Sequence, residues 1–276
     1  MSLSYKVESQ DISTSGWNYT SSSSYITLSF WVKSSVAQNF YGYLYANNGS
    51  RLRSFETGSL TADTWTKVTR TISGDSNLAF NNDNAQGLQI HFAQFWGTDF
   101  TDGSHSLNTW AAYSGSSRMP DNTSTWYTTN DATFEITGVQ LEVGSQATSF
   151  EHRSFDSELD LCHRYYQRWE FDADKIGVAV LHVSSNTTSY STWKYYKPLR
   201  SSGSDTSFSY SGASDFDLIL DGNYDRAITT ITMSTSRRGK YQSEFVVQWS
   251  AAGSSDECAS LRSNGSSGWL AFSAEL

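Results

Sequence analysis

Alternation of apolar and polar residues is clearest in the stretch Ile26-Thr-Leu-Ser-Phe-Trp-Val-Lys33. Side chains of an extended chain point to opposite sides in turn, so the four apolar residues at even-numbered positions would share one face. The odd-numbered positions, with Trp31 among them, would share the other face. The stretch therefore predicts a β-strand with one buried face and one exposed face, and it decides the fold class.

Similar short patterns recur along the first half of the chain and end at turn-rich segments. They predict strands at residues 40–45, 65–72, 88–96 and 133–143. The predicted shared face of the third of these strands consists of Leu88, Ile90, Phe92 and Trp96. In the fourth strand the apolar residues change parity across Gly138, which predicts a β-bulge. Short strands without a long helical pattern up to about residue 150 predict an antiparallel sandwich or jelly roll.

The periodicity changes after residue 152. Apolar residues then recur at spacings of four and three, which predicts a helix with a narrow apolar stripe. The stripe consists of Phe155, Leu159, Cys162, Tyr166 and Trp169. Ser154 is placed to cap the helix start. The stripe suits a short coiled-coil seam between chains as well as a helix packed on one sheet, and the sequence leaves both interpretations open.

Apolar segments beyond the helix predict a second, smaller β domain. Its predicted strands cover residues 176–183, 216–220, 228–233, 245–249 and 269–272, with Asp221-Gly222-Asn223 as a hairpin turn. The first of them is an almost continuous apolar run, which predicts a strand buried on both faces. The chain is therefore predicted to be all-β. It comprises an N-terminal jelly-roll sandwich (residues 1–152), a linker helix (153–170) and a distal β-sandwich domain (171–276).

Composition argues against several classes of protein. The chain of 276 residues has 19 Lys and Arg against 28 Asp and Glu, a net charge of −9, and no basic run, so nucleic acid and anionic membrane are not expected as partners. No apolar stretch approaches the about 20 residues that span a bilayer, and polar residues follow Met1, so no membrane insertion and no secretion signal are expected. Cys162 and Cys258 are too few for a disulfide framework and lack metal-ligand spacing.

No catalytic motif is present in the sequence. The five histidines lack the spacing of a zinc site, and there is no nucleophile elbow or phosphate-binding glycine loop. A carboxylate pair that meets only in the fold is left open. Oxygen ligands for calcium are offered by Asp215, Asp217, Asp221 and Asp225, and by Asp83 among Asn81, Asn82 and Asn84. Neither group has the spacing of a calcium-binding loop, so turn residues are the favoured interpretation, and neither a cofactor nor an enzymatic activity is predicted.

Aromatic side chains are the better candidates for a binding site, because sugar rings stack on Trp and Tyr faces. Tyr41, Tyr43 and Tyr45 alternate and so share one face of a strand. The other candidates are Trp96, Trp110, Trp126 and Tyr127 in the first domain, and Trp193, Tyr195, Tyr196 and Tyr224 in the distal domain. Packing in the core or between domains is favoured over a platform for the tyrosine stripe. Packing inside a trimer explains the distal residues at least as well as receptor contact.

A long motif crosses the boundary between the two predicted domains. It runs from Ile136-Thr-Gly-Val-Gln-Leu-Glu-Val-Gly-Ser145 through Ala147-Thr-Ser-Phe-Glu-His-Arg-Ser154 to Glu158-Leu159 and Cys162-His-Arg-Tyr-Tyr166. The motif closely resembles a junction of bacteriophage tail-fibre and related virion proteins, where it ends a carbohydrate-binding-module-like jelly roll and opens the distal domain. Ser149, Phe155 and His163 stand where that family typically has proline, tyrosine and glutamine. Residues 26–35 and 274–276 also resemble the same family. The resemblance as a whole is strong over most of residues 20–170 and weak over the rest of the chain.

The resemblance implies a tail-fibre fragment of the phage virion, made in the host cytoplasm. Such a fragment would act as a homotrimer, joined through the helix and the distal domain, and would attach to the host by binding a cell-surface glycan. It also implies that more sequence precedes the equivalent of Tyr5, so the jelly roll would lack or borrow upstream strands. A purely structural virion spacer is one alternative. A carbohydrate-binding module of a secreted hydrolase is another, disfavoured by the motif and by the missing secretion signal.

Overall fold

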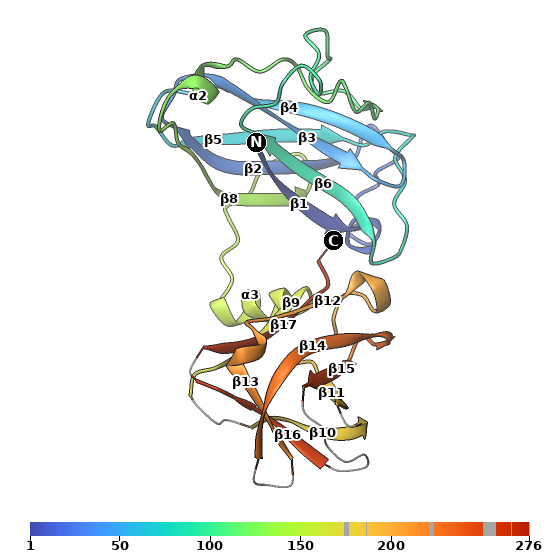
Figure 1. Cartoon of the computed structure of the whole chain (residues 1–276). Helices are drawn as coiled ribbons and strands as arrows, with labels where there is room; N and C mark the ends of the chain where they lie inside the picture. The colour runs from blue at the N-terminus through green and yellow to red at the C-terminus, as the bar shows by residue number, and fades with distance from the viewer. Residues whose placement is uncertain (174–176, 186, 221–223, 251–257, 266, 276) are drawn as a thin grey trace. The chain divides into compact units, whose positions relative to one another are not determined.

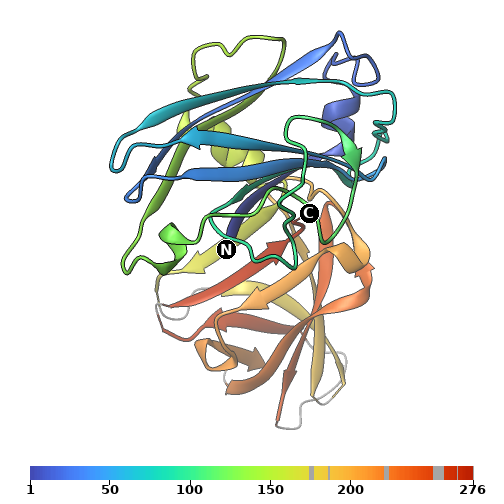
Figure 2. The ribbon, with the colours of Figure 1, turned by 90° about the horizontal axis from the view of Figure 1, so that it is seen from above.

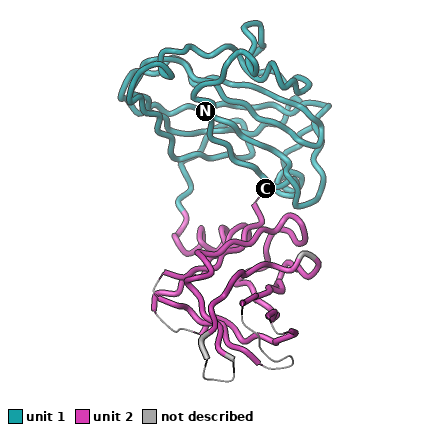
Figure 3. Tube along the Cα trace, in the orientation of Figure 1, with its two compact units in different colours: residues 1–152, 276 teal, residues 153–275 magenta. Residues whose placement is uncertain are grey.

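A computed structural model describes residues 1–173, 177–185, 187–220, 224–250, 258–265 and 267–275. Most of the regular structure is β-strand, which confirms the predicted all-β class. The chain divides into two compact units, Met1–His152 and Arg153–Glu275 (Figure 3). In the described part of the chain no helix is both long and apolar enough to cross a membrane.

The first unit is a jelly-roll-like sandwich of two antiparallel sheets (Figure 1). One sheet has five strands in the order β1-β6-β3-β4-β7, and the other has three in the order β5-β2-β8. The elements are β1 (Ser2–Glu8), α1 (Ser9–Ser13), β2 (Tyr25–Ser34), β3 (Asn39–Ala46), β4 (Arg51–Ser59), β5 (Thr66–Ser73), β6 (Gln86–Ala93), β7 (Ala111–Ala112), α2 (Thr125–Thr128) and β8 (Phe134–Val143).

The core of this unit lies between the two sheets. The four apolar residues of 26–33 all point into it, as the alternation predicts, and Phe30 is completely buried. The Phe30 ring contacts Phe55 on β4 and Phe92 on β6, with centroid separations of 6.2 and 5.0 Å. Burying one such ring contributes about 1.5–3 kcal/mol to folding. Trp96 differs from the prediction: it follows the end of β6 and lies in a separate cluster with Tyr43.

The bulge predicted at Gly138 is present in β8. Ser29 on β2 pairs with Gln140, but Trp31 pairs with Thr137, so β8 holds one more residue than β2 over this interval. Gly138 has φ +58°, in the left-handed region that glycine adopts readily. The extra residue resets the alternation, so that Leu141 packs against the core.

The segment after β8 folds back over the outer face of the three-stranded sheet. The Thr148 amide donates to Glu142 Oε1 at 2.9 Å, and the Glu151 amide donates to Gln140 Oε1 at 2.9 Å. The Gln140 Nε2 donates in turn to the Ser149 carbonyl oxygen at 3.4 Å. These side chains belong to the junction motif, and their role in this structure is to fix the path by which the chain leaves the first unit.

The second unit contains a closed barrel of six strands in the order β10-β11-β15-β14-β13-β16, and a three-stranded sheet β12-β17-β9. Its elements are α3 (Phe155–Cys162), β9 (Tyr166–Phe171), β10 (Gly177–Ser185), β11 (Thr188–Lys194), η1 (Gly203–Asp205), β12 (Ser207–Tyr210), η2 (Ala213–Asp215), β13 (Phe216–Leu220), β14 (Tyr224–Arg238), β15 (Gln242–Trp249), β16 (Cys258–Ser263) and β17 (Gly268–Ser273). The second unit was expected to be a β-sandwich, but six of its strands form a closed barrel. The short strand β16 escapes the pattern analysis, and it pairs with both β10 and β13 and so closes the barrel.

The predicted helix is shorter than its apolar stripe. It ends at Cys162, and Tyr166 and Trp169 lie on β9, which pairs with β17. Ser154 caps the helix as expected, because its Oγ accepts from the Ser157 amide at 3.3 Å. Tyr166 and Trp169 continue the spacing of four and three residues in the sequence by coincidence. The predicted stripe therefore extended beyond the end of the helix.

Strand β10 is buried on one side only. Leu181 and Val183 are buried, whereas Val180 is 72% exposed, so the prediction of a strand buried on both faces is wrong. A barrel encloses the inward residues of each strand and leaves the outward residues to solvent. The predicted turn 221–223 lies outside the described residues. Both cysteines, Cys162 and Cys258, are exposed and free.

Candidate functional site

The outer face of the five-stranded sheet carries the tyrosine stripe. Strand β3 lies between β6 and β4, and its Tyr41, Tyr43 and Tyr45 share this face. Tyr43 stands opposite His91 on β6 and Ser54 on β4. The stripe thus runs along the middle of the sheet, on the side away from the core.

Tyr43 is packed, while the flanking tyrosines stay partly exposed. It is only 3% exposed and stacks on the His91 ring with a centroid separation of 4.4 Å. Burial raises the pKa of Tyr43 to about 12, although the nearby Arg118 charge partly offsets this. Tyr41 and Tyr45 keep part of their surface accessible, so they can offer ring area to a ligand.

The long connection between β6 and β8 covers part of this face. Figure 2 shows it in green as an irregular chain beside the strands of the sheet. His105 anchors it, because its Nε2 lies 2.8 Å from Ser54 Oγ and its Nδ1 lies 3.1 Å from Ser117 Oγ. Met119 is completely buried against Tyr43 and Leu52. The connection therefore has a fixed position on the sheet and contributes side chains to the face.

Arg118 is the central residue that the connection contributes. Its guanidinium carbon lies 5.0 Å from the ring centroid of Trp96, 5.1 Å from that of Phe100 and 5.5 Å from that of Tyr113. Such cation–π contacts stabilise by about 0.5–2 kcal/mol each. Its Nε is buried, and no hydrogen-bond partner for it is found among the described residues. The result is a guanidinium that is held by aromatic rings and still partly exposed.

Two cations lie close to His91 beside the stripe. Burial, together with the charges of Arg118 and Lys6, lowers the pKa of His91 to about 4. His91 is therefore neutral at pH 7, and the two cations beside it stand out in a chain of net charge −9.

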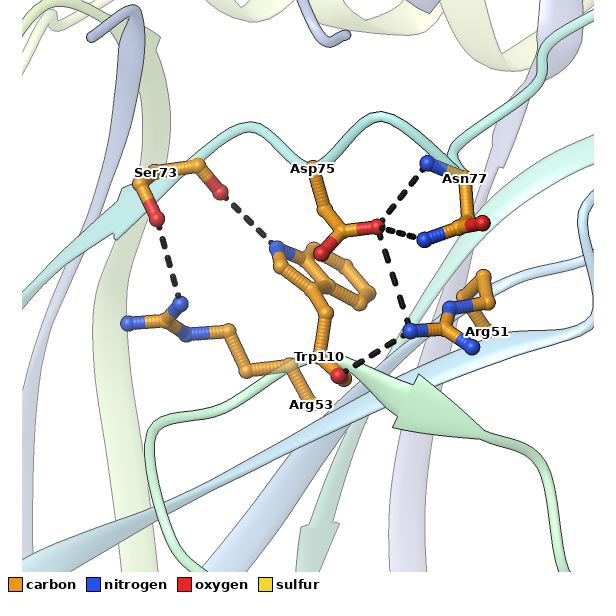
Figure 4. A network of polar contacts seen from close by, with 6 residues as sticks. All are labelled: Arg51, Arg53, Ser73, Asp75, Asn77 and Trp110. Carbon is orange, nitrogen blue, oxygen red and sulfur yellow. Dashed lines mark hydrogen bonds and ion pairs between the residues drawn. The ribbon is translucent and has the colours of Figure 1, made fainter. Parts of the chain in front are cut away.

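Trp110 holds the end of the sandwich together instead of facing solvent (Figure 4). It is 6% exposed, and its Nε1 donates to the Ser73 carbonyl oxygen at 2.8 Å. Its own carbonyl oxygen accepts from Arg51 at 3.1 Å, and Arg51 lies 3.8 Å from Asp75 Oδ1. Burial alone would raise the pKa of Asp75, but hydrogen bonds from Asn77 and the Arg51 charge outweigh it and lower the pKa. Trp110 is thus placed to stabilise the fold.

Trp126 is likewise a packing residue. It is 7% exposed, and its Nε1 donates to the Thr133 carbonyl oxygen at 3.0 Å. Its neighbour Tyr127 is 62% exposed and stacks on Phe95 with a centroid separation of 4.4 Å. Of these two candidates, only Tyr127 offers an accessible ring.

The candidates of the second unit form a packed cluster around Phe272. Trp193 stacks on the Phe272 ring at 6.4 Å, and Tyr195 meets the same ring at 5.1 Å. The Tyr195 hydroxyl lies 2.5 Å from Ser243 Oγ. Tyr196 is 59% exposed and stacks on Trp169 at 4.5 Å. Tyr224 begins β14, but its side chain lies outside the described residues.

Two pockets lie in the second unit. The first, of about 360 Å³, is lined by Thr192, Ser236, Arg237, Arg238, Gly239, Gln242 and Glu244. The second, of about 250 Å³, is lined by Arg168, Glu170, Phe171, Asp172, Ser267, Gly268 and Trp269. None of the predicted glycan-binding residues is among these described lining residues. Nowhere in the described part of the chain do three His, Cys, Asp or Glu side chains gather as a metal ion would require.

Several residues of the outer face were not selected from the sequence. Arg118 could have been found, because it is the only Lys or Arg between Thr71 and His152. Outside this face, Trp31 on β2 and Trp65 just before β5 are each 41% exposed and were not selected either. The signal for Trp31 was its place among the polar residues of the alternating stretch 26–33. Phe100 and Tyr113 lie on the irregular connection, where no periodicity indicates which way a side chain points.

No protein-family model and no curated protein matches this sequence. What the chain does is therefore inferred from its own residues and their arrangement.

Proposed function

We propose that the chain is part of a bacteriophage tail fibre and that its first unit attaches to the host by binding a surface glycan. The observation that carries this proposal is the outer face of the five-stranded sheet. There, Trp96 and Tyr113 contact the guanidinium of Arg118, and the rings of Tyr41 and Tyr45 on the same face are partly exposed. Rings of this kind stack on sugars, while polar neighbours hydrogen-bond the sugar hydroxyls. The resemblance of the junction motif to virion proteins supports a place in the tail fibre.

Substitution of the accessible tyrosines tests the binding face. Tyr41→Ala and Tyr45→Ala are expected to reduce binding to a glycan array about tenfold or more, because each removes a stacking surface. Tyr241→Ala is the matched control, since Tyr241 is 71% exposed and lies in the other unit. Retained binding in both face variants, with unchanged circular dichroism, would contradict the proposed face.

We also propose that the chain assembles as a homotrimer through α3 and the second unit. All eight residues of α3 are exposed, including Phe155 (77%), Leu161 (52%) and Leu159 (40%). An isolated helix of this length is unstable in water. Burial of its apolar residues against other copies would supply the missing stabilisation.

Light scattering on the purified chain tests the assembly. A trimer is expected, and Phe155→Ser together with Leu159→Ser should shift it towards monomer. Asp156→Ser, on the same helix, is the control and should leave the mass unchanged. A monomeric wild-type chain at every workable concentration would overturn the proposed trimer.

A structural spacer is the second candidate function. It is favoured by the burial of Tyr43, Trp110 and Trp126, because these side chains pack inside the unit and form no exposed platform. A chain that forms trimers and binds no glycan would be a spacer.

A further inference from the structure

We propose that the outer face of the five-stranded sheet selects acidic glycans, with the Arg118 guanidinium pairing with the carboxylate of a sugar such as a hexuronate or a sialic acid. This inference rests on the proposed glycan-binding function and specifies the class of sugar. It follows from the place of Arg118 among the aromatic rings, from the absence of an ion-pair partner among the described residues and from the charge around it.

Among the described residues, the Arg118 guanidinium forms no ion pair with a carboxylate. Arginines held among aromatic rings commonly pair with a carboxylate. The Nε of Arg118 is buried without a hydrogen bond, and the Tyr43 hydroxyl interacts with the guanidinium. A planar guanidinium matches a carboxylate through two parallel N–H···O bonds, so an incoming acidic sugar would pair with its terminal nitrogens, because the Nε is buried.

Two acidic side chains of the same connection are engaged elsewhere. Asp121 Oδ1 accepts from the Thr101 hydroxyl at 2.6 Å, and Asp102 Oδ1 accepts from the Ser104 amide at 2.9 Å and from its hydroxyl at 2.7 Å. These bonds engage both carboxylates with residues other than Arg118.

The surroundings strengthen attraction of an anion. Rings of Trp96, Phe100 and Tyr113 around the guanidinium exclude water from part of its surface, and charges interact more strongly where water is excluded. Lys6, on the neighbouring edge strand β1, is close enough to lower the pKa of His91 together with Arg118. A carboxylate arriving beside His91 would therefore meet the charge of Arg118, with Lys6 nearby. The carboxylate of this face, Glu56 opposite Tyr41, accepts from Asn39 Nδ2 at 2.7 Å, and Tyr41 and Tyr45 stay partly accessible for the sugar ring.

Calorimetric titration of the full chain with matched sugars tests the inference. The probes are tetragalacturonate and its methyl ester, which have the same rings and differ in charge, and sialyllactose with lactose. The acid of at least one pair is expected to bind at least tenfold more tightly than its neutral partner. Binding of the acid should weaken as sodium chloride is raised from 50 to 500 mM.

Variants locate the effect. Arg118→Met should reduce binding of the acid at least tenfold, and Arg118→Lys should reduce it less, because lysine retains the charge and loses the two-pronged geometry. Lys67→Met is the control, since it removes an exposed cation from the other sheet of the same unit. If Arg118→Met fails to fold, Arg118→Lys and the comparison of acid with ester on the wild-type chain still decide the matter.

The outcomes separate this inference from the proposed function. Equal binding of acid and ester, or preference for the neutral sugar, would overturn the acidic preference and leave glycan binding in place. Full acid binding by a folded Arg118→Met variant would overturn the assigned site. A glycan array on which no sugar of either kind binds would overturn the proposed function and, with it, the inference.

Discussion

The two units differ in where the aromatic clusters outside their main cores lie. In the first unit, Tyr41, Tyr45 and Trp96 lie on the outside of a sheet and keep part of their surface accessible. In the second unit, Trp193 and Tyr195 pack around the completely buried Phe272. Each sheet of a sandwich has an outer face in addition to the face in the core. An irregular connection can add side chains to that outer face. The accessible aromatic residues of the first unit therefore point to binding. The packed aromatic residues of the second unit point to stability.

The largest expected effect tests whether the second cluster is a core. Phe272→Ala should destabilise the second unit by about 3–5 kcal/mol, because it empties the centre of a packed aromatic cluster. Urea denaturation followed by near-ultraviolet circular dichroism measures the loss. Tyr241→Ala, at a 71% exposed position of the same unit, should change stability by less than about 0.5 kcal/mol. Equal effects of the two variants would break the contrast between the units.

The tyrosine stripe of the first unit contains a smaller contrast of the same kind. Tyr43→Ala should cost about 2–4 kcal/mol of stability, because Tyr43 is 3% exposed and stacks on His91. Tyr45→Ala should cost less than about 1 kcal/mol, since Tyr45 is partly exposed. Thermal unfolding of both variants provides the comparison. A Tyr45 variant as unstable as the Tyr43 variant would show that the stripe is packed along its whole length.

Trp110 should have an intermediate effect. Trp110→Phe removes the indole donor and leaves the Ser73 carbonyl oxygen without its 2.8 Å hydrogen bond, which should cost about 1–3 kcal/mol. Trp65→Phe, at a 41% exposed position, is the matched control and should cost less than about 0.5 kcal/mol. Urea midpoints of the two variants would coincide if the network in Figure 4 contributed nothing to stability.

The smallest effect is a pH dependence confined to the first unit. The unfolded chain takes up a proton on His91 below about pH 6.5, whereas the folded chain does so only near pH 4. Stability present above pH 6.5 is therefore lost as pH falls from 6.5 to 4, by at most about 1.4 kcal/mol per pH unit and by less because the ring is partly exposed. His91→Gln should flatten the slope of the urea midpoint against pH. Burial also lowers the pKa of His105, so part of the slope should remain in this variant. An identical slope in the variant and the wild-type chain would contradict the low pKa of His91.

The sequence predicted most where neighbouring residues alone determine the geometry. Alternation predicted β2, and the parity change at Gly138 predicted the bulge in β8. Closure of the barrel depends on pairing of β16 with two strands distant in sequence, which local patterns do not encode. For the candidate site, the sequence predicted that the tyrosines share a face. It could not place Arg118 over that face, because the connection that carries it follows no periodic pattern.

The folded-back segment after β8 has a mechanical consequence. Tension on the chain beyond Glu151 would first load the hydrogen bonds that Gln140 and Glu142 make to residues 148–151. These bonds would have to break and release a few residues of slack before force reached the ladder between β8 and β2. The segment would thus delay the transfer of force to the strands of the sandwich. Protonation of Glu142, whose pKa the bonds from Thr148 and Gln140 hold low against the effect of burial, would weaken it in acid.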